Sequence, residues 1–310
     1  MTKFRLPITY FFSIILISFQ LVSCKTSKNA SNDKAGLDKA LLWKVTGPGL
    51  NKPSYVFGTI HLIDADDYFL PKGTMSALDE VNKVVFELDM KEMSDMSKLM
   101  GMMNKLYMND DKTLKDLLTD AEYKKVGDFF QEKGLPLFMF ERMKPMFLSI
   151  FASGDMNPGD LQSGKMKSYE MELLELAENA GKATGGLETI EFQISLFDAI
   201  PYDAQAKMLL ESIEKGSKGD EDDEFEKMTK MYKSQDINAM VSMISEEGSD
   251  VSGFEDKLLT ERNKNWIPLM IEMAKKQPTL FAVGAGHLGG QSGVLKLLMK
   301  EGYKLTPMSK

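Results

Sequence analysis

Histidine and cysteine are scarce in this sequence, and its 38 lysines and arginines are outnumbered by 46 acidic residues. The 310 residues contain two histidines and one cysteine. A single cysteine excludes an intramolecular disulfide bond. The formal net charge of −8 argues against binding of nucleic acid through its phosphates. The hydrophobic share of 43% and the charged share of 27% are ordinary for globular proteins, so the composition does not indicate overall disorder.

The amino terminus has the features of an export signal. Lys3 and Arg5 provide a basic start, a long apolar run follows, and this run ends in Leu21-Val-Ser-Cys24. These four residues resemble the bacterial lipoprotein box, in which the cysteine becomes the lipidated first residue of the mature protein. We therefore predict a lipoprotein signal peptide over residues 1–23, a lipid anchor at Cys24 and a flexible tether over residues 24–40. The predicted location is the bacterial cell envelope, lipid-anchored at the outer membrane or facing the periplasm; an uncleaved amino-terminal anchor is the alternative.

The two histidines lie in two similar segments. The first segment runs Pro-Ser-Tyr-Val-Phe-Gly-Thr-Ile-His61-Leu, and the second runs Pro-Thr-Leu-Phe-Ala-Val-Gly-Ala-Gly-His287-Leu. Each contains a short β-favouring apolar run that reaches Gly-x-x-His. A buried strand followed by glycine fits a sharp turn at the carboxyl end of a sheet, where open α/β sheets place their ligands. We therefore expect both imidazoles at one edge of one sheet; the alternative for either is a polar residue satisfied at a strand end.

Two carboxylates are predicted at strand ends as well. The run Lys83–Asp89 reads as a strand with Glu87 near its end, and the run Lys182–Glu188 reads as a strand that delivers Glu188. A carboxylate at the end of a buried strand is costly unless another group pairs with it. A predicted helix over residues 255–276 carries Arg262, Asn263 and Trp266 nearby. Either glutamate could instead form a structural ion pair with Arg262.

The order of the predicted elements indicates the fold class. Strands are expected near both ends of the mature chain, and a long helical block lies between them. We therefore predict an α/β (α+β) fold over residues 41–310, with a central mixed sheet built from amino- and carboxyl-terminal segments and a large methionine-rich helical insertion or cap at about residues 91–165. The 24 methionines are concentrated in this block and in residues 228–243. They are expected to fill core gaps in helices; the alternative is an adaptable groove for apolar peptides.

The predicted site combines imidazoles, carboxylates and a guanidinium group. His61, His287 and Glu87 are candidate ligands of a divalent metal ion, with an open position for water. Glu87 or Glu188 is a candidate general base, and Arg262 a candidate for stabilising an oxyanion or binding a substrate carboxylate. The spacing is not that of the H-E-x-x-H helix, so it does not identify the metal. Direct acid-base catalysis by a histidine and a glutamate, without metal, is the alternative.

These segments together resemble the TraB/PrgY/GumN family. The resemblance covers the chain from about Leu41 to Pro307 and rests on six stretches: Leu42-Trp-Lys-Val45, Gly58-Thr-Ile-His61, Phe86-Glu87-Leu-Asp89, Gly186-Leu-Glu188-Thr189 with Gln193, Arg262-Asn263, and Val283-Gly-Ala-Gly-His287-Leu288 with Gly293. It implies peptide handling and, in some animal members, metal-dependent proteolysis, with manganese, cobalt and zinc all open as the metal. Tyr169-Glu170 stands where many relatives have Gly-Asp, so the resemblance assigns no role there.

Two functions follow as predictions. The first is a membrane-anchored, divalent-metal-dependent peptidase or hydrolase that uses a metal-activated water, with a peptide or protein substrate and with membrane attachment through Cys24. The second is a non-catalytic envelope lipoprotein that binds or sequesters a peptide or a metal through the same cleft. Hydrolysis of an ester or another non-peptide bond would use the same water. Nucleic acid is not expected as a partner.

Overall fold

The structure is a computed structural model that describes residues 37–92, 96–152, 163–218, 220–244, 254 and 256–308. The predicted signal peptide, Cys24 and the tether up to residue 36 lie outside the described residues. Among the described residues, no helix combines the length and the apolar character needed to cross a bilayer.

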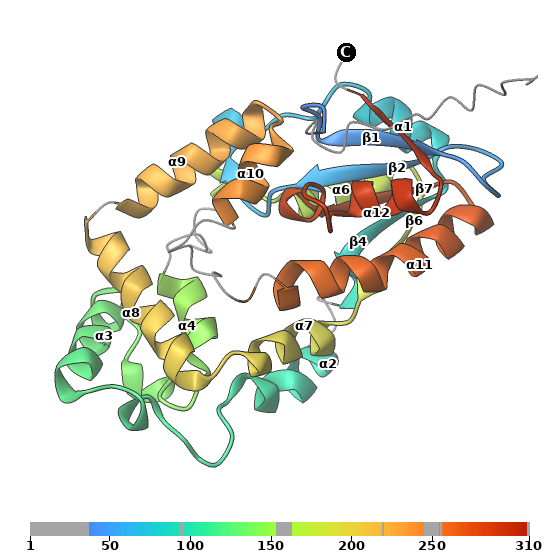
Figure 1. Cartoon of the computed structure of the whole chain (residues 1–310). Helices are drawn as coiled ribbons and strands as arrows, with labels where there is room; N and C mark the ends of the chain where they lie inside the picture. The colour runs from blue at the N-terminus through green and yellow to red at the C-terminus, as the bar shows by residue number, and fades with distance from the viewer. Residues whose placement is uncertain are drawn as a thin grey trace, which may run out of the picture. The chain divides into compact units, whose positions relative to one another are not determined.

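A six-stranded mixed sheet organises the described part of the chain (Figure 1). Its order is β6-β4-β7-β2-β1-β8, in which β6, β4, β7 and β2 run parallel and β1 pairs antiparallel with both β2 and β8. The strands are β1 (Leu42–Thr46), β2 (Ser54–Thr59), β4 (Lys83–Leu88), β6 (Ala183–Glu188), β7 (Thr279–Gly284) and β8 (Lys304–Pro307). The sheet therefore joins segments from both ends of the chain, and the predicted α/β fold with a mixed sheet is confirmed.

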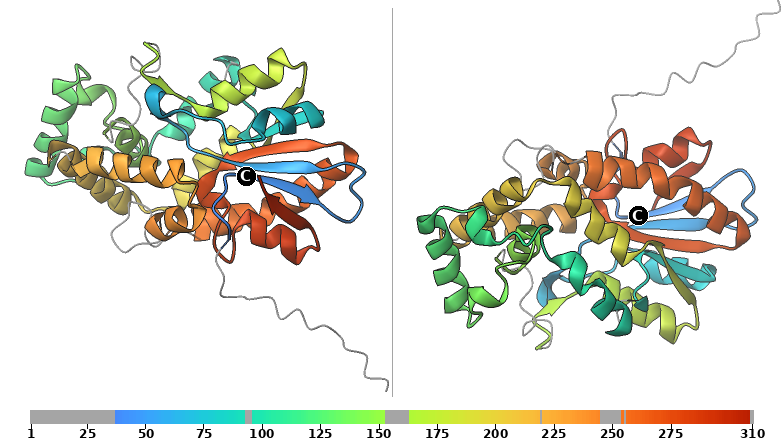
Figure 2. Two further views of the ribbon diagram at one scale, coloured as in Figure 1. Left: turned by 90° about the horizontal axis from the view of Figure 1, so that it is seen from above. Right: turned by 90° about the horizontal axis from the view of Figure 1, so that it is seen from below.

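Helices cover both faces of this sheet. Helices α1 (Thr74–Glu80) and α6 (Tyr169–Asn179) lie on one face, and α11 (Glu261–Lys276) and α12 (Val294–Lys300) lie on the other (Figures 1 and 2). All six residues of β2 and the first five of β7 are buried. This explains their nearly continuous apolar sequences, because a parallel strand covered on both faces has no solvent side on which to place polar residues.

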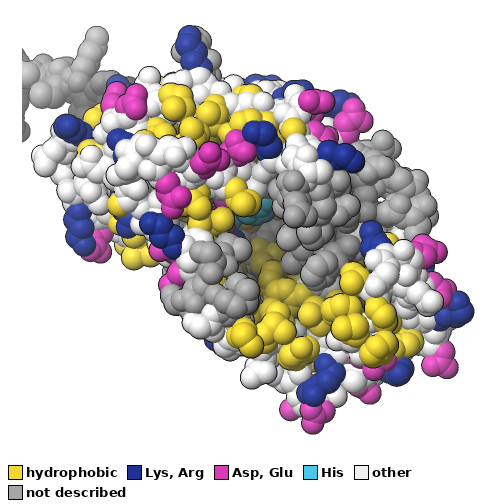
Figure 3. Space-filling view, turned by 180° about the vertical axis from the view of Figure 1, so that it is seen from behind, with side chains coloured by type: hydrophobic (Ala, Val, Ile, Leu, Met, Phe, Trp, Pro, Cys, Tyr) yellow, Lys and Arg dark blue, Asp and Glu magenta, His cyan; other side chains and the backbone are white. Residues whose placement is uncertain are grey.

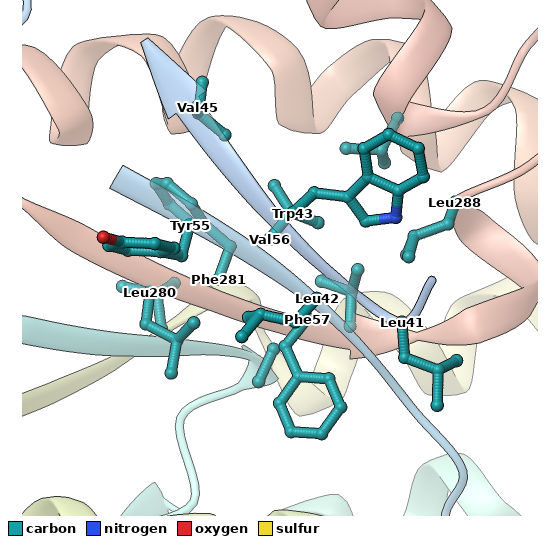
Figure 4. Close-up of a cluster of buried hydrophobic side chains, with 14 of the residues drawn as sticks. Leu41, Leu42, Trp43, Val45, Tyr55, Val56, Phe57, Leu280, Phe281 and Leu288 are labelled. Carbon is teal, nitrogen blue, oxygen red and sulfur yellow. The ribbon is translucent and has the colours of Figure 1, made fainter. Parts of the chain in front are cut away.

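The main hydrophobic core fills the space between the sheet and these helices. Side chains of β1 and β2 project to both sides of the strands, with Trp43 on one side and Phe57 on the other (Figure 4). The indole N–H of Trp43 donates a hydrogen bond to the backbone oxygen of Ala40 at 2.9 Å. A large aromatic group is thus buried with its polar atom satisfied.

A second group of helices forms a separate hydrophobic cluster. Helices α3 (Asp120–Glu132), α4 (Pro145–Ala152) and α8 (Tyr202–Lys218) pack together through side chains that include Phe130, Leu148 and Leu209. The predicted helical insertion is thus present, and α8 reaches it from beyond residue 165. Helices α9 (Asp220–Lys233) and α10 (Ile237–Ile244) then lead back toward the sheet, where Tyr232 and Ile237 join the main core.

The methionines of this region divide between core and surface. Met102 and Met108 are buried, as expected for side chains that fill gaps in a core. Met100, Met103 and Met139 are exposed, at 69%, 44% and 61% of their possible surface. The prediction that these methionines fill gaps in a core is therefore correct for some of them only.

A small second sheet was not predicted. Its strands β3 (Ile63–Asp64) and β5 (Met166–Lys167) pair antiparallel, with Ile63 opposite Lys167. A ladder of two residues has no periodic pattern, and the sequence around Ile63 reads as a loop. This pairing places the start of α6 beside the segment that follows β2.

Candidate active site at the carboxyl edge of the sheet

The two Gly-x-x-His segments leave the sheet at the same edge. Strands β2 and β7 are parallel neighbours, and Thr59 at the end of β2 lies opposite Gly284 at the end of β7. His61 follows β2 by two residues, and His287 closes the 3-10 turn Ala285–His287 directly after β7. The predicted placement of both histidines at one sheet edge is therefore confirmed by the strand register.

The glycines of these segments allow the two turns to approach closely. A Cβ atom on Gly58 would lie 2.9 Å from Leu288 Cδ2 and 3.1 Å from the Cα of Ala285. A Cβ atom on Gly284 would lie 3.3 Å from Oε1 of Glu87. Neither glycine has a positive φ angle. The sharp glycine turn predicted from the sequence is therefore not found, and the two glycines instead allow close packing between the two segments and the glutamate.

Arg262 connects the buried charged groups of the site. Its Nη2 donates to Glu87 Oε2 at 2.5 Å and to Glu188 Oε2 at 2.8 Å, and its Nε lies 3.1 Å from both oxygens of Glu188. Its Nη1 donates to the backbone oxygen of Leu258 and lies 3.2 Å from Nε2 of His287. Every nitrogen of the guanidinium group therefore has an acceptor. Leu258 belongs to the π-helical turn Asp256–Thr260 that precedes α11.

Glu87 is held as an anion. Its side chain is 15% exposed, Oε1 accepts the backbone N–H of Gly284 at 2.8 Å, and Oε2 accepts Arg262. Burial opposes ionisation, but His287, which is protonated only in the acidic range where Glu87 titrates, lowers the pKa of Glu87 to about 2 together with the charges of Arg262 and His61 and the Gly284 hydrogen bond. The site thus contains a permanent negative charge beside both histidines.

His287 is buried and neutral. Its Nδ1 lies 2.7 Å from Oδ1 of Asn263, whose own amide nitrogen donates to the backbone oxygens of Ser292 and His287. Since Oδ1 of this amide can only accept, Nδ1 carries the proton and Nε2 has the lone pair. Burial is the main cause that lowers the pKa of His287 to about 4, with a further contribution from the charge of Arg262. The ring also stacks on Trp266, with 4.4 Å between centroids.

His61 has the opposite environment. Its side chain is 80% exposed, and Nδ1 lies 3.2 Å from Oε1 of Glu170. The hydrogen bond to Glu170 is the largest cause that raises the pKa of His61 to about 9, and the charges of Glu170 and Glu87 add to it. The charges of Glu87 and His61 thus act on each other, and the charge of His61 also contributes to the lowered pKa of His287. Glu170 had no role in the sequence prediction.

Glu188 belongs to the support of Arg262. Its side chain is 5% exposed, and both of its oxygens accept hydrogen bonds from Arg262. Trp266 Nε1 donates to it at 2.7 Å and Gln193 Nε2 at 3.0 Å. The structural ion pair considered from the sequence therefore describes the geometry of Glu188, and Gln193 and Trp266 complete its surroundings.

The residues of this edge fit a divalent metal ion in donor chemistry. Nε2 of His287 lies 3.7 Å from Oε1 of Glu87, a separation that two ligands each about 2 Å from one shared ion can span. Nδ1 of each histidine is engaged by a hydrogen bond, which leaves Nε2 as the ligand atom. Within the described ranges, however, no three His, Cys, Asp or Glu side chains come together as a metal-binding group. Arg262 lies 3.2 Å from Nε2 of His287, which has the lone pair, and donates to Oε2 of Glu87, so a metal ion would compete with it for Nε2.

A hollow on the molecular surface gives access to the site. The space-filling view shows a histidine side chain inside this hollow, with apolar side chains gathered along part of its wall (Figure 3). His61 is the exposed one of the two histidines, so solvent and ligands reach it before they reach His287.

Known proteins with related sequences include animal metalloproteases. Metalloprotease TIKI2 of Danio rerio is 23% identical over 319 aligned residues, which cover 86% of this chain and 60% of the relative. Metalloprotease TIKI1 of Xenopus tropicalis is 23% identical over 352 residues, covering 94% and 67%, and TIKI1 of Homo sapiens is 23% identical over 319, covering 86% and 61%. The chain thus spans about three fifths to two thirds of the length of these relatives.

No solved structure matches this chain significantly. The sequence profile of the TraB/PrgY/gumN family matches residues 41–307, which include every strand of the central sheet and every residue of the site, and the chain therefore belongs to this family.

Proposed function

We propose that this chain is a divalent-metal-dependent peptidase of the bacterial envelope, anchored to the membrane through Cys24. The observation that carries the proposal is the delivery of two histidines by adjacent parallel strands to the sheet edge at which Glu87 is held as an anion. The names of the related metalloproteases support the choice of reaction. The export features of residues 1–24 support the location.

Three side chains would hold the metal. Glu87 would contribute Oε1, which faces His287 rather than Arg262. His61 and His287 would contribute Nε2, and that of His287 would have to be released by Nη1 of Arg262. When bound, a divalent metal supplies Lewis acidity toward a peptide carbonyl and a water nucleophile near neutral pH. The residues present favour manganese, cobalt or zinc equally, because imidazole and carboxylate ligands suit all three.

Arg262 and Glu188 would keep the site charged and ordered. The guanidinium group balances two buried carboxylates, and its charge helps to keep His287 neutral. Because all its nitrogens have acceptors, Arg262 acts through Glu87 and His287, and contact with a substrate would require it to release one of them. Glu188 holds Arg262 in place and has no free oxygen with which to accept a proton from water.

The surface near this edge favours a substrate with apolar side chains. Helix α7 (Ile190–Leu196) starts two residues after β6 ends, and it packs against Met102 of α2 (Met96–Met102) and against Leu88, the neighbour of Glu87. On the same helices Met100 is 69% exposed and Phe192 is 37% exposed. Exposed thioether and aromatic groups on helices that pack together beside Leu88 are suited to binding the varied apolar side chains of an extended peptide.

Cleavage of a peptide library tests this proposal. The purified chain is stripped with a chelator, refilled separately with manganese, cobalt or zinc, and incubated with the library, and the products are read by mass spectrometry. We expect new peptide termini only in refilled samples, and their loss in Glu87→Gln. The control Glu175→Gln changes an exposed glutamate on α6 and should leave cleavage intact.

The alternative, a lipoprotein that only binds a peptide or a metal, gives a different result. Peptides would then be retained by the refilled chain without any new termini, and Glu87→Gln would have no turnover to lose. That outcome would refute the peptidase proposal and leave the binding function.

A further inference from the structure

His61 depends on a residue from a distant part of the chain for its orientation. Its ring follows β2 in an exposed segment, and within the described ranges Glu170 is the only side chain bonded to it. The two residues are 109 positions apart in the sequence. The pairing is therefore a product of the fold, and the short ladder between β3 and β5 brings the two segments together.

Glu170 is itself held firmly. Oε1 accepts the hydroxyl of Thr59 at 2.8 Å, and Oε2 accepts the hydroxyl of Ser168 at 3.2 Å. The side chain is only 15% exposed and lies in the first turn of α6, where the helix dipole favours a negative charge. The neighbouring Tyr169 is fully buried, and its hydroxyl donates to the backbone oxygen of Phe69 at 2.6 Å. The start of α6 is thus a fixed platform for the carboxylate.

We propose that Glu170 is a positioning residue that fixes the ring of His61. A carboxylate oxygen only accepts, so Nδ1 of His61 carries its proton toward Glu170 in both the neutral and the cationic form of the ring. Nε2 therefore always points away from Glu170 and is the atom offered to a ligand or substrate. The role of Nε2 in catalysis rests on the proposed function, but its orientation by Glu170 does not.

The second histidine shows the same arrangement built from other groups. Nδ1 of His287 is bonded to the amide oxygen of Asn263 at 2.7 Å. Its Nε2 therefore points away from Asn263, and it lies 3.2 Å from Nη1 of Arg262 and 3.7 Å from Oε1 of Glu87. A buried ring is oriented by a neutral amide, and an exposed ring by a charged carboxylate. A charge-assisted hydrogen bond is the stronger of the two, which suits a ring that water surrounds.

Nitrogen NMR of the imidazole rings tests the proposal without any measurement of turnover. The chain is labelled with 15N in histidine, and its two rings are assigned with His61→Gln. We expect a protonated, hydrogen-bonded Nδ1 for His61 in the native chain and the loss of this signature in Glu170→Ala. Glu170→Gln should restore most of it, because the side-chain amide oxygen also accepts a hydrogen bond.

His287 and a neighbouring glutamate provide the controls. The signals of His287 should stay unchanged in every Glu170 variant, which shows that the fold is intact. Glu172→Ala removes a carboxylate of the same helix that pairs with Lys167 at 3.0 Å, and it should leave His61 unaffected. The proposal is overturned if Glu170→Ala keeps the native His61 signals, or if Glu172→Ala changes them as much. A peptidase could still exist in that case, so the two proposals fail separately.

Discussion

His61 and His287 end two similar segments on adjacent strands, but their environments differ in every respect. The side chain of His61 is 80% exposed and that of His287 is 6% exposed. A carboxylate raises the pKa of the first to about 9, and burial lowers the pKa of the second to about 4. The sequence segment thus determines where each ring lies, and residues from other parts of the chain determine which charge it carries.

This difference gives the site two distinct halves. The buried half contains His287, Glu87 and Arg262 in a fixed network of hydrogen bonds. The other half contains the exposed ring of His61 and its partner Glu170. A ligand that binds both histidines would therefore contact one rigid wall and one solvent-facing wall.

Removal of the positive charge of Arg262 from the buried half should lower the unfolding free energy more than any other change proposed here. Arg262→Ala leaves Glu87 and Glu188 as buried carboxylates without their cation, which typically costs about 3–5 kcal/mol of unfolding free energy. Urea denaturation measures this value. Lys264→Ala, on the exposed side of the same helix, should cost less than about 0.5 kcal/mol. Equal stability of the two variants would mean that the network does not support the fold.

Forcing the two Gly-x-x-His segments apart should lower the unfolding free energy by an intermediate amount. Gly58→Ala places a methyl group 2.9 Å from Leu288 and 3.1 Å from the backbone of Ala285, and such overpacking costs about 1–3 kcal/mol. Gly101→Ala in α2 places a methyl group that meets no described atom within 4 Å, so it should be neutral or stabilising. Thermal unfolding of both variants checks the contrast, and a neutral Gly58→Ala would show that the close approach is not required.

The smallest expected effect is on the pH dependence of the unfolding free energy, to which the two histidines should contribute in different pH ranges. Because the pKa of His61 is raised, its protonation stabilises the fold at pH values below 6.5, the ordinary pKa of histidine. This contribution is lost as the pH rises from 6.5 to about 9. The lowered pKa of His287 stabilises the fold above 6.5, and this contribution is lost as the pH falls from 6.5 to about 4.

Urea midpoints across this pH range, measured with chelator present, test both statements. His61→Gln should flatten the curve only on the alkaline side, and His287→Gln only on the acidic side. Flattening on the same side by both variants would contradict the assigned environments.

Much of the fold was predictable because its signals are local. The apolar runs of β2 and β7, the hairpin from β1 to β2 and the final strand β8 each follow from a pattern within one segment. The two-residue ladder of β3 and β5 has no such pattern and was missed. The mixed sheet was predictable from the presence of strands at both ends of the chain.

The site was predictable only in part, because its charges interact over long sequence distances. Glycine and histidine spacing located His61 and His287, and a strand pattern located Glu87. The partner of His61 could not be found in this way, since Glu170 is 109 positions away and lies in a helix that reads as an ordinary amphipathic one. A carboxylate within the first turn of α6, next to a fully buried tyrosine, was the only local signal.

Metal binding by the two histidines is the most direct test of this account. The stripped chain and the double variant His61→Ala, His287→Ala are titrated with manganese, cobalt and zinc by calorimetry, with circular dichroism to confirm that both are folded. We predict one ion per native chain and loss of this binding in the double variant. Absence of binding by the folded native chain, or unchanged binding by the double variant, would contradict a metal site shared by His61 and His287.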